Sequence, residues 1–249
     1  MSAPIHLPDY RPKAVEPLAC MKAGWELIKG QYWLFVGLTA VGFLIGSFVP
    51  LGILLGPMMC GIYLALFKTR RGQPVEFGDL FKGFDYFGDS VVATLLHVVP
   101  MLVIFVPSYI VFYIAIFFMM PRDGSEPNPT TMISFFAFFA VFWIVMMVLL
   151  IIISVAFTFA YPLIVDRRLS GINAVKLSIK AAMANFWQIL GMLLLNGLLS
   201  LGGVVLCYVG VFLVLPITFA AIAMAYEQVF GLDSGEMRPN LPPPPPTFT

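Results

Sequence analysis

The segment from Met132 to Val165 contains no Asp, Glu, Lys, Arg or His, and this apolar run limits the possible folds more than any other feature. A helix needs only about 20 apolar residues to cross a bilayer, and helices in soluble cores are rarely so long and so apolar. The chain is 60% hydrophobic and 11% charged, whereas soluble domains carry about 25% charged residues. The sequence therefore predicts an all-α, polytopic membrane protein.

Apolar stretches of this kind recur along the chain and predict about six transmembrane helices. The third contains Pro100 and Pro107, which remove backbone donors and should kink it, and the fourth is longer than the hydrocarbon layer requires. The expected spans lie at 33–49, 53–67, 91–119, 131–165, 187–206 and 210–229.

Basic residues are distributed unevenly between these spans. All but one of the 14 Lys and Arg residues lie in the N-terminal segment, in the second and fourth loops or in the C-terminal tail. The exception is Arg122, in the third loop. Because basic loops are retained on the cytoplasmic side of a membrane, we expect both termini to be cytoplasmic.

The three basic segments, around residues 18–32, 77–85 and 172–186, share a second property. Each combines apolar residues at helical spacing with polar residues between them, which is typical of an amphipathic helix lying in the membrane interface. Each also ends in an aromatic pair at the start of a span, and aromatic rings favour the headgroup depth. The expected interfacial side chains are Trp25, Ile28, Trp33, Phe77, Phe81, Phe84, Ile179 and Trp187.

This pattern divides the chain into three repeats, each an interfacial amphipathic helix followed by a transmembrane hairpin, with the middle copy enlarged. In the first and third copies, Pro57 and Pro216 each precede an aromatic residue, Phe67 and Tyr226, by ten residues. A gap is needed to align the copies, as is common for diverged repeats.

The ends of the chain differ in composition from the membrane domain. The tail contains the run Pro242 to Pro246, which must be extended as polyproline II and is either a ligand for an aromatic groove or a passive terminus. We expect a cytoplasmic segment at 1–13, a six-span domain at 14–230 and a disordered Pro-rich cytoplasmic tail at 231–249.

Several short motifs resemble a known family. These are YPLIVD at 161–166, SGINAVKLS at 170–178, NFW at 185–187, and GPMMCG at 56–61 followed by FGDLFKGF at 77–84. Together they resemble the membrane domain found with bacterial glycerophosphoryl diester phosphodiesterases and its stand-alone relatives. The resemblance implies a six-span helical protein of the bacterial inner membrane. It transfers no catalytic residues, because the phosphodiesterase activity belongs to a separate soluble barrel.

His97 is the only ionisable residue well inside an expected span, and such residues are candidates for function. No charged residue accompanies it, so we favour a neutral histidine hydrogen-bonded to a neighbouring helix over a transport role. Arginines at span ends could hold anionic lipid headgroups, although positive-inside topology alone explains them. These are Arg70, Arg71, Arg167 and Arg168.

The sequence offers no constellation for catalysis or for a cofactor. His6 and His97 are the only histidines, and Cys20, Cys60 and Cys207 lie far apart without the CxxC spacing of a metal site. No Ser/His/Asp set, carboxylate pair or phosphate loop can be assembled. We therefore expect neither enzymatic activity nor a cofactor, and the net charge of +1 does not favour nucleic acid as a partner.

Two classes of function fit these features best. The first is a non-catalytic protein that organises the membrane or recruits partners at the cytoplasmic leaflet, with membrane lipids as its partners and a protein partner bound through the tail or in a larger assembly. The second is a passive channel or small-solute permease, favoured by the number of spans and the prolines within them. A lipid-modifying enzyme is a weaker third. A water-accessible cavity at the membrane midplane would favour the second class over the first.

Overall fold

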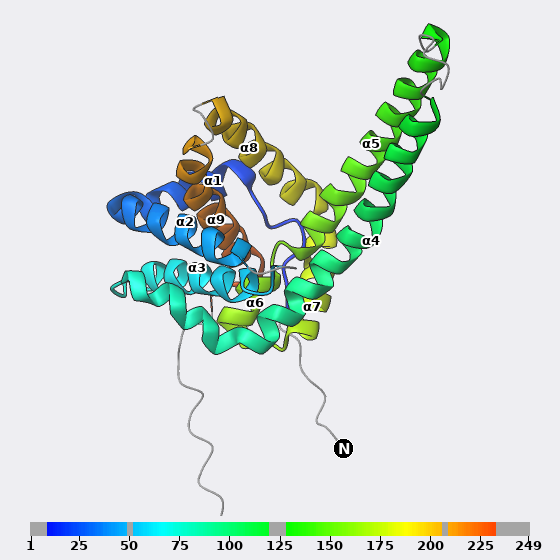
Figure 1. Ribbon diagram of the computed structural model, residues 1–249. Coiled ribbons are helices and arrows are strands. Elements are labelled where there is room, and N and C mark those ends of the chain that lie inside the picture. Colours follow the sequence, from blue (N-terminus) through cyan, green and yellow to red (C-terminus); the bar gives the residue numbers. More distant parts are fainter. Residues whose placement is uncertain (1–8, 49–51, 120–127, 206–208, 233–249) are drawn as a thin grey trace, which may run out of the picture.

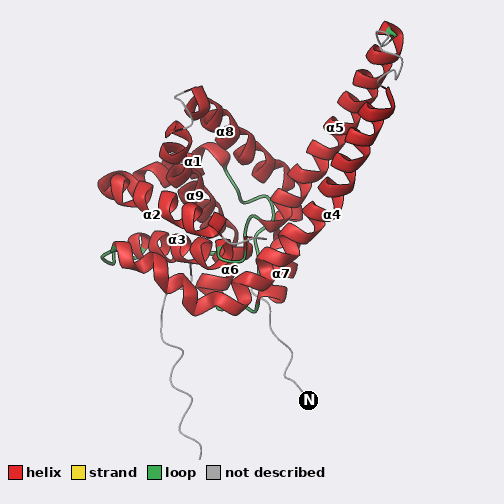
Figure 2. Cartoon of the chain, in the orientation of Figure 1, coloured by secondary structure: helices red, strands yellow, loops and turns green. Residues whose placement is uncertain are grey.

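The computed structural model describes residues 9–48, 52–119, 128–205 and 209–232, and every regular element in these ranges is helical (Figure 2). The elements are α1 (Pro17–Ile28), η1 (Lys29–Gln31), α2 (Tyr32–Phe48), α3 (Leu55–Arg70), η3 (Phe77–Tyr86), α4 (Phe87–Met119), α5 (Pro129–Phe157), α6 (Ala160–Arg167), α7 (Gly171–Ala184), α8 (Phe186–Val205) and α9 (Val209–Phe230). The all-helical prediction is confirmed for these residues.

Five helical segments within the described ranges are long and apolar enough to cross a membrane, which agrees with a multi-pass membrane protein. They are Pro17–Phe48, Phe77–Met119, Pro129–Arg167, Phe186–Gly203 and Gly210–Phe230. The span expected at 53–67 coincides with α3, which is not among the five. α3 has 16 residues, a length of about 24 Å at 1.5 Å per residue, against about 30 Å of hydrocarbon. The count of six spans is therefore not confirmed.

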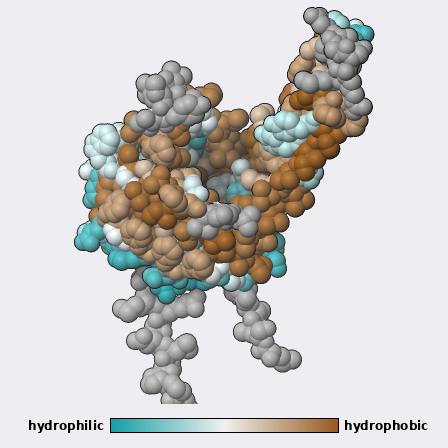
Figure 3. All heavy atoms as spheres, in the orientation of Figure 1, coloured by the Kyte–Doolittle hydropathy of each residue, from teal (hydrophilic) through white to brown (hydrophobic). Residues whose placement is uncertain are grey.

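The longest hairpin consists of α4 and α5 and projects far from the rest of the chain, at the upper right of Figure 1. α4 continues through both Pro100 and Pro107 as one helix. Many large apolar side chains along these two helices are exposed (Figure 3). Because such a surface is unstable in water, the hairpin needs lipid or another apolar partner around it.

The fourth expected span, 131–165, is divided by a break between α5 and α6. Ser178 of α7 inserts its hydroxyl there: it donates to the Ala156 carbonyl at 2.7 Å and accepts from the Phe159 amide at 3.1 Å. Pro162 has no backbone N–H and cannot continue the hydrogen-bond ladder. A side chain that enters the ladder close to a proline is a recognised cause of a sharp bend.

Each of the three segments expected to be interfacial packs against helices from another part of the chain. α1 packs on α9, η3 on α3, and α7 on α4, α5 and α6. Glycines permit the closest contacts: a methyl group at Gly24 would lie 2.7 Å from the Ala221 nitrogen, and one at Gly83 would lie 2.0 Å from the Pro57 oxygen. The second segment is a series of 3-10 turns, opened by a capping box between Glu76 and Asp79.

α3, α6 and α9, which we call the closing helices, converge at one end of the molecule. We call the region around Arg71, Asp166 and Tyr226 the base. Aromatic rings fill the centre of this region: Phe67 and Phe159 lie 5.5 and 6.3 Å from the Tyr226 ring. The described chain ends also meet nearby, since the Arg11 amide donates to the Val229 carbonyl at 2.9 Å. The first and last described segments of the chain thus lie side by side.

Candidate functional site

The side chains expected at a membrane interface are mostly at the surface. Trp33 and Trp187, in the first turns of α2 and α8, are 74% and 76% exposed. Ile28 is the exception, since it is fully buried in the core against the underside of the bundle. The other five are partly exposed, from 39% to 45%: Trp25, Phe77, Phe81, Phe84 and Ile179.

Neighbouring rings hold several of these side chains in place. Trp25 packs edge-on against Tyr32 at 5.4 Å, and Phe84 stacks on Phe87 at 6.3 Å. The Phe77 ring lies close to Gly37 of α2, where an added methyl group would be 3.4 Å from it. The fold therefore holds these apolar side chains in fixed positions at the surface.

Ion pairs join the three closing helices at the base. Arg70 of α3 binds Glu227 of α9 with two hydrogen bonds of 2.7 and 2.8 Å. These bonds raise the pKa of the Arg70 guanidinium. Arg71 donates to Asp166 of α6 at 2.7 Å, and the Tyr226 hydroxyl donates to the other Asp166 oxygen at 2.8 Å. The Asp166 side chain is fully buried, so this carboxylate is the centre of the network.

Three of the four arginines expected to hold lipid headgroups thus have partners within the chain. Arg70 and Arg71 are in the pairs just described, and Arg167 donates to the carbonyls of Phe230 and Gly231 at 3.1 and 3.0 Å. A role in headgroup binding stays a prediction for all four. In the structure, Arg70 and Arg167 fasten α3 and α6 to α9, and Arg71 joins α3 to α6.

A second buried carboxylate holds η3 against α3. Asp79 is 1% exposed and accepts from Lys68 at 2.8 Å and from Lys82 at 2.6 Å. It also accepts from the Glu76 amide at 3.0 Å, which closes the turn. Lys82 therefore neutralises a buried carboxylate while its own side chain stays 58% exposed.

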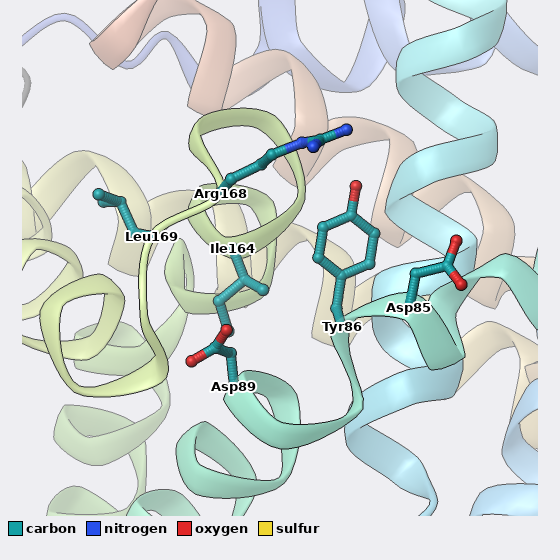
Figure 4. Close-up of a pocket in the computed structure, with 6 residues that line it drawn as sticks. All are labelled: Asp85, Tyr86, Asp89, Ile164, Arg168 and Leu169. Carbon is teal, nitrogen blue, oxygen red and sulfur yellow. The ribbon is translucent and has the colours of Figure 1, made fainter. Parts of the chain in front are cut away.

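A polar hollow of about 350 Å³ lies next to the base, between the start of α4 and the connection from α6 to α7. Its lining residues are Asp85, Tyr86, Asp89, Ile164, Arg168 and Leu169 (Figure 4). The Arg168 side chain extends over Tyr86, whose hydroxyl points toward the guanidinium, and Asp85 and Asp89 lie on opposite sides of the Tyr86 ring. The fourth arginine is therefore part of a hollow that contains charges of both signs.

His97 differs from the expectation of a hydrogen-bonded histidine. Its ring stacks on Phe157 of α5, with centroids 4.6 Å apart and planes at 10°. Its Nε2 atom is buried and has no hydrogen-bond partner among the described residues. We expect His97→Phe to retain the fold and to raise the melting temperature in detergent slightly, because it removes a buried polar atom and keeps the ring contact. A fall of more than about 5 °C, or roughly 1–2 kcal/mol, would contradict this interpretation.

Sequence reasoning missed the two buried carboxylates. Asp79 stands three residues after Glu76, which is the spacing of a capping box, and this signal could have identified it. Asp166 stands between an apolar span and two arginines, but its partners Arg71 and Tyr226 are distant in sequence. Only the packing of the closing helices brings these three residues together.

Some expectations concern residues outside the described ranges. They involve His6, Arg122, Cys207 and the Pro-rich tail from Pro239 onward. Within the described ranges, no group of three or more His, Cys, Asp or Glu residues could hold a metal ion. Cys20 and Cys60 are buried free thiols.

Comparison with known proteins gives no relative from which a function could be taken. No protein-family model matches the chain, and neither a curated protein nor a solved structure matches it. The resemblance to the membrane domain of glycerophosphoryl diester phosphodiesterases therefore stays a prediction, and the function must be argued from the geometry.

Proposed function

We propose that the chain is a non-catalytic protein of the bacterial inner membrane that organises lipid and recruits partners at the cytoplasmic leaflet. The observation that supports this most is the arrangement of α1, η3 and α7. Each is packed tightly against the bundle, and each leaves large apolar side chains partly exposed beside basic residues. A surface of this kind suits the boundary between acyl chains and headgroups.

The packing order supports three repeats within this fold. η3 of the second copy packs on α3 of the first copy, and α7 of the third copy packs on α5 and α6 of the second. α1 of the first copy packs on α9 of the third. Gly24 of α1 and Ser178 of α7 each stand eight residues before the aromatic pair, and each contacts the backbone of another helix directly. We interpret this as a closed ring of three units with both termini in the cytoplasm.

An apolar groove between α2 and α9 also supports contact with lipid. A groove of about 620 Å³ lies between α2 and α9, and its lining is almost entirely apolar: Phe43, Leu44, Ser47, Phe48, Val211, Phe212 and Leu215. Each large side chain removed from water contributes about 1.5–3 kcal/mol. Acyl chains would fill such a groove without leaving polar groups unpaired.

The rival function, a passive channel or small-solute permease, finds less support. In the described part of the chain, the polar hollow lies at the base, and the larger groove between α2 and α9 is apolar and open to the surface. His97 is stacked on a neighbouring ring. Solute flux through reconstituted vesicles that depends on His97 would favour the rival.

Spin labels test the proposed depth of η3. Labels at Phe77 and Lys82 in lipid nanodiscs, with the native cysteines replaced, should differ: the first should be accessible to oxygen in the acyl region and the second to a polar nickel reagent. Loss of Lys82 leaves Asp79 its bond from Lys68, so the element should stay in place. A label at Lys180, an exposed residue of α7, is the aqueous control. Equal water exposure at Phe77 and Lys82 would contradict the proposal.

A further inference from the structure

The charged residues around the polar hollow are paired differently from those in the adjacent base. Arg70 and Arg71 each have a carboxylate within ion-pairing distance. Among the described residues, no ion pair within 4.0 Å includes Arg168, Asp85 or Asp89. One cation and two anions therefore border a space of about 350 Å³ without neutralising one another directly.

The backbone at Arg168 is a second unusual feature of this site. Arg168 caps the C-terminus of α6 in the left-handed conformation, with φ 49° and ψ 38°. Glycine or asparagine is preferred at such a position, because other side chains cost free energy there. An arginine that persists in this conformation suggests that its side chain has a use that offsets the strain.

The lining matches a ligand that contains a phosphate and an ammonium group. A guanidinium presents a planar set of donors that suits phosphate oxygens, and the Tyr86 hydroxyl next to it can donate as well. Asp85 and Asp89 supply acceptors for an ammonium group on either side of the Tyr86 ring. Ile164 and Leu169 add an apolar wall where the uncharged part of a ligand could lie.

We propose that this hollow binds a phosphoethanolamine zwitterion, presented as the headgroup of a membrane lipid. This inference rests on the proposed function, which places the base at the cytoplasmic headgroup layer. Arg168 and Tyr86 bind the phosphate, while Asp85 binds the ammonium group. Asp89 also accepts a hydrogen bond from the Gly171 amide at 2.9 Å, so it holds the start of α7 as well.

The test is a binding titration on the full chain in mild detergent, followed by native mass spectrometry. The probes are phosphatidylethanolamine, phosphatidylglycerol with the same acyl chains, and free phosphoethanolamine. We expect phosphatidylethanolamine to bind about tenfold more tightly than phosphatidylglycerol, a difference of about 1.4 kcal/mol. If free phosphoethanolamine binds as tightly as the lipid, the zwitterion site stands and its source is soluble.

Two variants separate the roles of the charges. Arg168→Gly should weaken binding of both lipids about tenfold or more without lowering the melting temperature, because glycine suits the left-handed backbone. Asp85→Asn should remove the preference for phosphatidylethanolamine and leave phosphatidylglycerol binding unchanged. Lys180→Gln removes an exposed charge of α7 outside the hollow and is the matched control.

Two results would overturn the inference: equal binding of both lipids by the unaltered chain, or unchanged binding by Arg168→Gly. The spin-label experiment distinguishes this failure from failure of the proposed function. If Phe77 is buried in lipid but Arg168→Gly binds normally, only the headgroup site is wrong. If Phe77 is exposed to water, the proposed function fails as well.

Discussion

Replacing Gly83 with alanine should detach η3 from α3 and destabilise the protein by about 3 kcal/mol or more, at the upper end of overpacking effects. The added methyl group would lie 2.0 Å from the Pro57 oxygen and 2.6 Å from the Gly61 nitrogen. Both neighbours are backbone atoms of α3 and cannot rotate away. The substitution must therefore push the two elements apart, which also separates Asp79 from Lys68.

Thermal unfolding in detergent measures this effect, and a loss of about 3 kcal/mol corresponds to roughly 10 °C for a chain of this size. Gly78→Ala is the matched control, because it lies in the same element and its added methyl group has no neighbour within 4 Å. Both variants replace a glycine with alanine, so both restrict the backbone of the unfolded chain to the same extent. Equal melting temperatures of the two variants would contradict the close contact between Gly83 and α3.

Replacing Asp166 with alanine should cost about 3–5 kcal/mol, as is typical when one partner of a buried ion pair is removed. The variant leaves the Arg71 guanidinium and the Tyr226 hydroxyl facing a space without their acceptor. It also removes the carboxylate oxygen that lies 3.3 Å from the Arg167 Nε atom. We expect the closing helices to separate at the base before the rest of the molecule unfolds.

Glu26→Ala provides the contrast for this prediction. Glu26 of α1 pairs with Lys29, the first residue of η1, but the two side chains are 61% and 53% exposed. Such surface pairs contribute about 0–1 kcal/mol. Denaturation in a mixed detergent series would compare the free energies of unfolding of the two variants. Similar losses for both would show that burial does not strengthen the Asp166 network.

These two positions also link stability to the proposed function. Gly83 packs directly on the backbone of α3, and Asp166 of α6 pairs with Arg71 at the C-terminal end of α3. If the interfacial elements act as a rigid surface, loosening either contact should also weaken lipid binding at the hollow, although neither residue lines it. Stability and lipid binding would then fall together in both variants.

The amino-acid sequence alone determined that this chain is helical and suited to a membrane. Long apolar runs such as 132–165 must be removed from water, and only helices satisfy every backbone group without outside partners in lipid. The exposure of Trp33, Phe77 and Trp187 agrees with the amphipathic pattern of their segments. These are local properties, because they depend on composition and on spacing within one segment.

Tertiary structure decided the features that depend on residues far apart in the sequence. Ser178 breaks the helix after α5, and α3 becomes a short buried helix because α2, η3, α4, α6 and α9 surround it. Arg71 pairs with a carboxylate 95 positions away, whereas Arg168 borders a hollow. The residues next to each arginine in the sequence do not predict this difference. Close packing and ion pairing are decided by which helices meet, and the meeting of helices is a property of the whole fold.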